Sequence, residues 1–321
     1  MSWPRSPSIR IPVLCLMATL ASQAGRADSR PELELVMDSQ LMDSGTQWRS
    51  WIDQAIAAVE SVGGRFPVPR IKVELHAGNG RNPVGHGWVR RTSPPEIHLR
   101  VSPDASLDEL LDEWHAYHEL AHLLLPFAGN QDIWFSEGLA SYYQYFLQAR
   151  AGVIEPEEAW RRLVAGFQRG FDDPAGQGEP LARLSPRMWK QRAYRRVYWS
   201  GAAFFLRVDH RLRIVAGEEQ SLDRTLAAFA SCCIEDGSRR WTARSLVHRL
   251  GELSVPEIWE EEFQRVIQSE AYPEFGLAAE ALGIVNFTGS GTDRKGLQLL
   301  DDTGRVRLRR ALALGTSYPS E

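Results

Sequence analysis

The chain has 321 residues, of which 43% are hydrophobic and 24% are charged, and its formal net charge is −4. This apolar share can build a sizeable core, and the mildly acidic balance argues against a nucleic-acid-binding protein. Of the 3 cysteines, Cys232 and Cys233 are neighbours and Cys15 lies near the amino terminus, so the fold must rest on its core rather than on disulfides.

Residues 1–27 have the order of a secretory signal peptide. Two arginines precede an apolar run from Ile11 to Leu20, and the small residues Ala24 and Ala27 offer cleavage sites. The run is too short to span a bilayer, so we expect cleavage and no stable membrane anchor. An uncleaved amino-terminal anchor is the alternative. The mature protein is therefore expected to be periplasmic or secreted.

The next part of the chain mixes strands with one helix. Glu32–Val36 alternates like a strand, and Gly45–Val62 shows the apolar periodicity of a helix that Gly63 and Gly64 end. Arg70–His76 and Glu96–Val101 are predicted strands on either side of a loop rich in Gly, Pro and Asn. These segments predict a small mixed sheet.

The run from Ser106 to Leu125 is expected to form one helix that carries a metal-binding motif. Ser106 and Glu109 have the spacing of a capping box, which marks the start of a helix, and Pro126 supplies the stop. Apolar residues recur between these limits at helical spacing. The motif His-Glu-Leu-Ala-His at residues 118–122 therefore lies on a helix.

Helical geometry separates the roles of the residues in this motif. His118 and His122 differ by roughly 40° around the axis and about 6 Å along it, so both imidazoles can bind one ion. Glu119 lies on the flank of that face, where its carboxylate reaches a water molecule rather than the metal, as a general base must. The spacing is typical of a hydrolytic zinc site.

A third ligand is offered by a second predicted helix. Catalytic zinc binds three protein ligands and keeps one position open for water. The segment from Trp134 to Tyr143 places Glu137 near its start, and the link from His122 is long enough to end one helix, turn and begin another. His118, His122 and Glu137 are therefore the candidate Zn2+ ligands.

These residues resemble the gluzincin superfamily of zinc metallopeptidases (peptidase MA-like), in which a HExxH helix is followed by a Trp-x-x-Glu-Gly helix. The resemblance implies that His118, His122 and Glu137 bind zinc and that Glu119 is the base. Tyr198 begins a Tyr-x-x-Gly-Ala sequence that is similar to a helix of the glycyl aminopeptidase-like proteins, the closest resemblance, where the tyrosine hydroxyl stabilises the oxyanion. Packing against its aromatic and arginine-rich surroundings is the alternative for Tyr198.

The chain departs from these families in several respects. It has no Gly-x-Met-Glu-Asn segment, by which the large zinc aminopeptidases hold a free amino terminus, and the link from His122 to Glu137 is shorter than is usual. The sequence therefore leaves endopeptidase and aminopeptidase activity open, and it favours a minimal catalytic unit.

Other polar residues are secondary candidates. His115 is about 10.5 Å along the helix axis from His122, too far for both to share one ion with His118. Two interpretations are open for a further set of residues: they contact substrate or support a ligand, or they only pack or face solvent. These residues are His86, His115, Ser141, Tyr194, Arg195 and Arg196. Four other histidines have no supporting partner that the sequence reveals, so we expect them only to pack or to face solvent. They are His76, His98, His210 and His248.

The expected fold is α+β, a zincin-like catalytic domain at residues 28–290. It comprises a small mixed α/β lobe at 28–105 and a mainly helical lobe at 106–290, with the HExxH helix at the cleft. The resemblance also implies that the strand Ile97–Val101 edges this cleft and can pair with an extended substrate.

Two later segments carry weaker predictions. The polar stretch Asp172–Glu179 is either a mobile lip over the site or a connector. Residues 291–321 are expected to form a hairpin, with strands at Leu297–Leu300 and Arg305–Leu308, followed by a tail.

The expected function is that of an exported zinc-dependent peptidase, which hydrolyses peptide bonds through a zinc-bound water with Glu119 as general base and Tyr198 at the oxyanion. The expected partner is a peptide or protein substrate, with no nucleic acid, and the oligomeric state is not fixed by the sequence. A non-catalytic exported protein that keeps the zincin fold to bind peptides or envelope partners is the alternative. A hydrolase of another substrate class is a third hypothesis.

Overall fold

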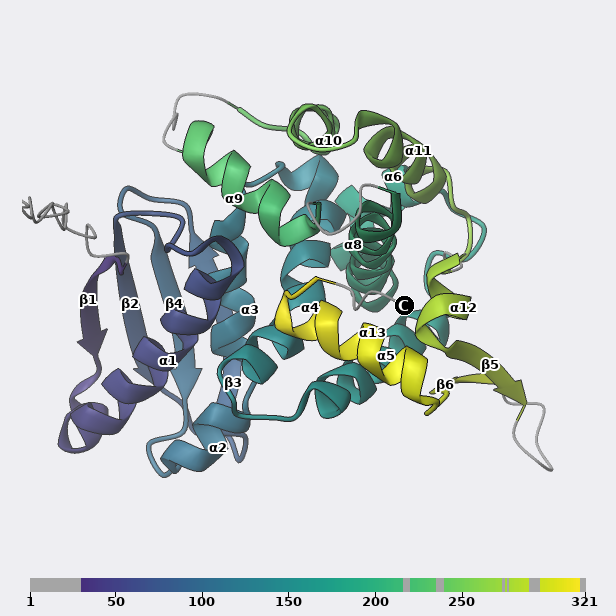
Figure 1. The fold of residues 1–321 in the computed structure, drawn as a ribbon. Helices are drawn as coiled ribbons and strands as arrows, with labels where there is room; N and C mark the ends of the chain where they lie inside the picture. Colours follow the sequence, from purple (N-terminus) through teal and green to yellow (C-terminus); the bar gives the residue numbers. More distant parts are fainter. Residues whose placement is uncertain are drawn as a thin grey trace, which may run out of the picture.

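A four-stranded mixed sheet forms the amino-terminal part of the computed structural model and lies at the left in Figure 1. The strands are β1 (Glu32–Met37), β2 (Arg70–Ala77), β3 (Val84–Arg90) and β4 (Glu96–Val101). Their order is β1-β2-β4-β3, with β1, β2 and β4 parallel and β3 antiparallel to β4. The structure describes residues 30–215, 220–234, 240–272, 275, 277–288 and 295–317, so the predicted signal peptide lies outside it.

Three of these strands confirm the sequence prediction, and β3 corrects it. Its residues were expected to be loop because Gly85 and Gly87 lower strand propensity. Since β3 takes the edge position, β4 lies inside the sheet, and the expectation that Ile97–Val101 edges the cleft was wrong. The edge strand beside the site is β3.

The two faces of the sheet differ in chemistry. Alternate residues such as Val73, Leu75 and Leu99 are fully buried in the core. Helix α1 (Gly45–Gly63), which follows a 3₁₀ turn at Ser39–Ser44, packs against helix α3 (His115–Ala121), and α3 in turn contacts β3 and β4. The opposite face of β2 and β4 carries polar side chains.

The helix expected over Ser106–Leu125 is divided in the structure. Ser106 caps α2 (Leu107–Asp112) with the predicted capping box, but Glu113 is extended and the chain restarts as α3, followed by a 3₁₀ turn at His122–Leu124. The physical reason is tertiary: the Nε2 of Gln148 donates hydrogen bonds to the carbonyl oxygens of Leu111 (3.1 Å) and Asp112 (2.8 Å). These carbonyls are thus satisfied without a continuous helix.

The rest of the chain is mainly helical, as expected for the α+β class, and is packed around α4, which is buried on nearly all sides. After a 3₁₀ turn at Asn130–Asp132, the helices are α4 (Ile133–Arg150), α5 (Pro156–Phe171), α6 (Leu181–Leu184), α7 (Met188–Gln191), α8 (Tyr194–Val215), α9 (Leu222–Cys232), α10 (Ala243–Glu252), α11 (Pro256–Ile267), α12 (Leu277–Leu282) and α13 (Thr303–Leu314), with a further 3₁₀ turn at Ser185–Arg187. Within the described ranges, no helix is both long and apolar enough to cross a membrane.

Helices α4 and α8 cross at two glycines. A Cβ atom at Gly138 would lie 2.5 Å from backbone atoms of Gly201, and a Cβ at Gly201 would lie 2.2 Å from the carbonyl oxygen of Trp134. No side chain fits between backbones this close. Both glycines belong to the motifs named above, so these motifs bring together the two helices that carry Glu137 and Tyr198.

The carboxy-terminal hairpin lies earlier than predicted. Strands β5 (Ile284–Thr288) and β6 (Lys295–Leu299) form it, whereas the expected strand Arg305–Leu308 belongs to α13. The reason is local, because the Asp302 side chain accepts a hydrogen bond from the backbone N–H of Arg305 (3.1 Å) and caps a helix. Cys232 and Cys233, at the end of α9, form a disulfide that closes no larger loop.

Candidate metal centre and cleft

His118, His122 and Glu137 converge, as the sequence predicted. The Nε2 of His118 lies 3.3 Å from the Oε2 of Glu137, and the Nε2 of His122 lies 3.6 Å from the same oxygen. One donor atom from each residue lies within 4.8 Å of the other two. Zinc at about 2.0–2.1 Å from each donor places tetrahedral ligands roughly 3.3 Å apart, so this spacing fits a zinc ion.

Burial and neighbouring charges shift the pKa values of all three residues. Burial lowers the pKa of His122 to about 3, so its imidazole is neutral near pH 7. Burial opposes the charge of Glu137, but the nearby His122 and His118 outweigh it and lower the pKa of this carboxyl. Burial likewise opposes protonation of His118, yet its hydrogen bond to Glu137 and the charges of Glu119 and Glu137 raise its pKa. Two imidazoles and an ionised carboxylate are a donor set typical of hydrolytic zinc.

Gln144, which the sequence analysis did not single out, orients one of the imidazoles. Its Oε1 lies 2.9 Å from the Nδ1 of His118, so this nitrogen carries the proton and the Nε2 faces Glu137. Histidine ligands usually have such a partner on the second ring nitrogen. Gln144 lies two turns after Glu137 on α4, a spacing that could have indicated a shared face.

Glu119 is enclosed beside the two histidines. Burial raises the pKa of its carboxyl to about 7, although the positive charge of Arg91, also missed from the sequence, acts in the other direction. A Cβ atom at Gly87 would lie 2.7 Å from the Cγ of Glu119, so only glycine allows β3 to approach this closely. A carboxylate with this pKa can accept and return a proton near neutral pH.

Tyr198, at the start of α8, faces the same group. Its hydroxyl interacts with the carboxylate of Glu137, and its ring lies 6.4 Å from that of His118 between centroids. Burial and the charge of Glu137 raise the pKa of this phenol above its usual value. The hydroxyl therefore keeps its proton and can act as a donor.

A cleft of about 1120 Å³ opens above these residues, between β3, α3, α4 and α8. Most of the secondary candidates line it, namely His86, His115, Ser141, Tyr194 and Arg195. Arg196 does not. Its buried guanidinium donates to the backbone oxygens of Glu179 (3.0 Å) and Ser269 (2.9 Å), and so ties the 172–179 segment in place as a connector.

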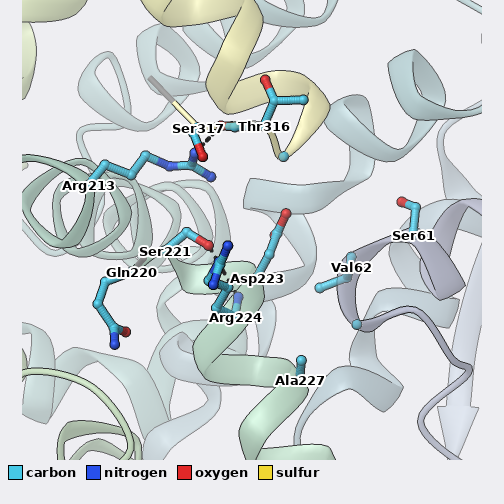
Figure 2. A pocket seen from close by; sticks show the side chains of 12 residues that line it. Ser61, Val62, Arg213, Gln220, Ser221, Asp223, Arg224, Ala227, Thr316 and Ser317 are labelled. Atoms are coloured by element: carbon cyan, nitrogen blue, oxygen red, sulfur yellow. Dashed lines mark hydrogen bonds between the residues drawn. The ribbon is translucent and has the colours of Figure 1, made fainter. Parts of the chain in front are cut away.

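A second cavity, of about 370 Å³, lies between α1, α9 and the end of α13 (Figure 2). It is lined by polar and charged side chains, including Arg213, Asp223 and Arg224. None of the residues predicted from the sequence to act in catalysis or metal binding borders this cavity. The candidate site therefore remains the cleft above α3.

Comparison with known proteins finds one matching family model. Residues 128–203 match the model of a family described as M61 glycyl aminopeptidase. The matched segment contains Glu137 and Tyr198 and begins after His122. A comparison with curated proteins gives no match.

One solved structure shows the same fold, and two others are less similar. An aminopeptidase N family protein from Idiomarina loihiensis is similar with a TM-score of 0.61 at 15% identity, over 80% of this chain and 48% of that chain. An M1 zinc metallopeptidase from Deinococcus radiodurans gives a TM-score of 0.47 at 13% identity, over 71% of this chain and 45% of that chain. A mutant M1 zinc metallopeptidase from the same organism, bound to a Tyr-Ser-Ala substrate, gives a TM-score of 0.47 at 14% identity, over 70% of this chain and 44% of that chain.

The chain thus spans about half the length of the solved structures that it matches. The fold is that of the aminopeptidase N family protein, and the family match lies on the helices that carry Glu137 and Tyr198. The chain therefore resembles the gluzincin-like zinc peptidases.

Proposed function

We propose that this chain is an exported zinc-dependent peptidase with its active site in the cleft above α3. The observation that carries the proposal is the convergence of His118, His122 and Glu137 on one point beside the enclosed carboxylate of Glu119. Ligands, base and hydrogen-bond donor then lie together in one cleft, as amide hydrolysis requires.

The proposed roles follow from these positions. Zinc held by His118, His122 and Glu137 would supply a Lewis acid that activates water at neutral pH. Glu119 accepts a proton from the attacking water and passes it to the leaving amine. Tyr198 donates its hydroxyl hydrogen to the oxygen that gains negative charge as the carbonyl carbon becomes tetrahedral.

The wall of the cleft suits an extended peptide. β3 is an edge strand whose residues His86, Gly87, Trp88 and Val89 line the cleft. A peptide chain can therefore add to this edge through backbone hydrogen bonds. Cleft volumes of about 300–1,000 Å³ accommodate ordinary small ligands, so about 1120 Å³ leaves room for several substrate residues.

The proposal is tested by a digest of mixed peptides with the purified protein, before and after removal of metal by a chelator. Cleavage should require zinc and return when zinc is added back. Glu119→Gln should retain zinc and lose about 10²–10⁴-fold in kcat. The exposed Glu257→Gln on α11 is the matched control and should leave kcat unchanged.

Unchanged turnover by Glu119→Gln would remove this residue from the mechanism. Zinc binding without cleavage of any peptide would favour the non-catalytic alternative. The positions of cleavage, at internal bonds or at free amino termini, decide between endopeptidase and aminopeptidase activity.

Export is a separate part of the proposal and is supported by the sequence of residues 1–27 alone. The protein recovered outside the cytoplasm should begin near residue 25 or 28, after Ala24 or Ala27. Intact mass and amino-terminal sequencing measure this start. Recovery of the full-length chain with Met1 retained would contradict cleavage.

A further inference from the structure

A second cluster of metal-binding side chains lies on the polar face of the sheet. Glu74 and His76 lie on β2 and His98 lies on the neighbouring β4, where it is paired in register with Glu74. On β2 the neighbours Val73 and Leu75 are buried, and on β4 the neighbours of His98 are buried too. Since alternate residues of a strand face opposite sides of the sheet, Glu74, His76 and His98 face away from the core that holds α3. The sequence analysis found no partner for His76 or His98, and the structure corrects this.

The three donor atoms have the spacing of a metal site. The Nε2 of His76 lies 3.0 Å from the Nδ1 of His98. The Oε2 of Glu74 lies 3.5 Å from the Nδ1 of His98 and 3.9 Å from the Nε2 of His76. These distances bracket the value of roughly 3.3 Å expected between tetrahedral zinc ligands. Both the donor set and the spacing match the cluster in the cleft.

A further charged group lies beside each of these residues. The Nε2 of His98 lies 3.4 Å from the Oε2 of Glu96, and the Nδ1 of His76 lies 4.0 Å from the Oδ1 of Asp38. The Oε1 of Glu74 pairs with Lys72 at 2.6 Å, which leaves Oε2 toward the histidines. A carboxylate on the outer nitrogen of a histidine ligand, as Glu96 is for His98, fixes the tautomer that a metal needs.

The cluster is rigid on one side and open on the other. The Trp88 ring stacks on His98, with centroids 4.8 Å apart and planes 2° apart, and lies 5.6 Å from the ring of His76. The His98 side chain is only 5% exposed, whereas those of His76 and Glu74 are 30% and 22% exposed. A bound ion would therefore have three fixed ligands and a solvent-facing fourth position.

We propose that Glu74, His76 and His98 form a second zinc site, separate from the cleft, with water as the remaining ligand. Nitrogen and carboxylate donors in this number favour zinc among the common divalent ions, because magnesium and calcium prefer all-oxygen sites. Because the site joins β2 to β4, zinc binding stabilises the sheet, by an amount that grows with the logarithm of the free zinc concentration above the dissociation constant.

The test is zinc binding to metal-free protein, measured by competition with a chromogenic chelator. The wild type should bind two equivalents of Zn2+. His76→Gln should lose one equivalent, and the exposed His248→Gln on α10 should lose none. Glu74→Gln is a second variant of the same site, and it is used if circular dichroism shows that His76→Gln is not folded.

His122→Ala separates this inference from the proposed function. It should remove only the cleft equivalent, and added zinc should still raise its melting temperature. That rise should vanish in the His76→Gln, His122→Ala double variant. If His76→Gln and Glu74→Gln both bind as much zinc as the wild type, the second site is refuted. If His122→Ala binds as much as the wild type while His76→Gln loses one equivalent, the cleft assignment is refuted instead.

Discussion

Replacing Gly201 by alanine should force α4 and α8 apart and disturb the candidate active site. The added Cβ would lie 2.2 Å from the carbonyl oxygen of Trp134. Carbon and carbonyl oxygen approach to about 3.3 Å at closest in ordinary packing, so the helices must separate locally by about 1 Å. The obstacle is backbone rather than a flexible side chain, which leaves no local rotation to relieve it.

Two magnitudes follow from this separation. Overpacking of a dense core costs about 1–3 kcal/mol, so the free energy of unfolding should fall by that amount. Since α4 carries Glu137 and α8 carries Tyr198, a displacement of about 1 Å should also lower kcat by up to about 100-fold.

Denaturant unfolding and a peptide-cleavage assay measure these effects in parallel. Gly45→Ala, at the start of α1, is the matched control, because its Cβ would have no atom within 4 Å and its φ of −52° suits alanine. It should leave stability unchanged or raise it by about 0.4–1 kcal/mol. A Gly201→Ala protein with stability within about 0.5 kcal/mol of wild type and full kcat would refute the packing argument.

Two further substitutions test single contacts in the cleft. Tyr198→Phe should lower kcat by about 10²–10³-fold with little change in KM, since the hydroxyl acts on charge that develops in the transition state. Wild-type values of kcat and KM would exclude Tyr198 as the oxyanion donor. Gln144→Leu should weaken zinc binding by about 10–100-fold, because the hydrogen bond to His118 is lost, and chelator competition measures this change. An unchanged dissociation constant would show that Gln144 does not orient His118.

The sequence predicted the cluster in the cleft because its ligands lie on local, periodic structure. His118 and His122 are four residues apart, which fixes their relative position on any helical backbone. The Trp-x-x-Glu-Gly motif was likewise predicted to be helical, which placed Glu137 on a separate helix that can pack beside the one with the histidines. The family resemblance added Tyr198, and the fold brings that residue to the same cleft.

The features that the sequence did not reveal depend on contacts between distant residues. The break after Asp112 is stabilised by Gln148 of α4, and no periodicity within the run itself records that contact. β3 was missed because its two glycines lower strand propensity, although one of them, Gly87, is needed for the close approach of Glu119. His76 and His98 become neighbours only because β4 pairs with β2, while β3 is inserted between them along the chain.

One stripe of α4 has a mechanical consequence for the cleft. Glu137, Gln144 and Gln148 recur at intervals that keep them on one side of the helix, and the two glutamines hold His118 and the end of α2. A tilt of α4 would therefore carry the carboxylate and the segment bearing both imidazoles along as a unit. The contacts of these two glutamines thus couple the position of the Glu137 carboxylate to that of the two imidazoles.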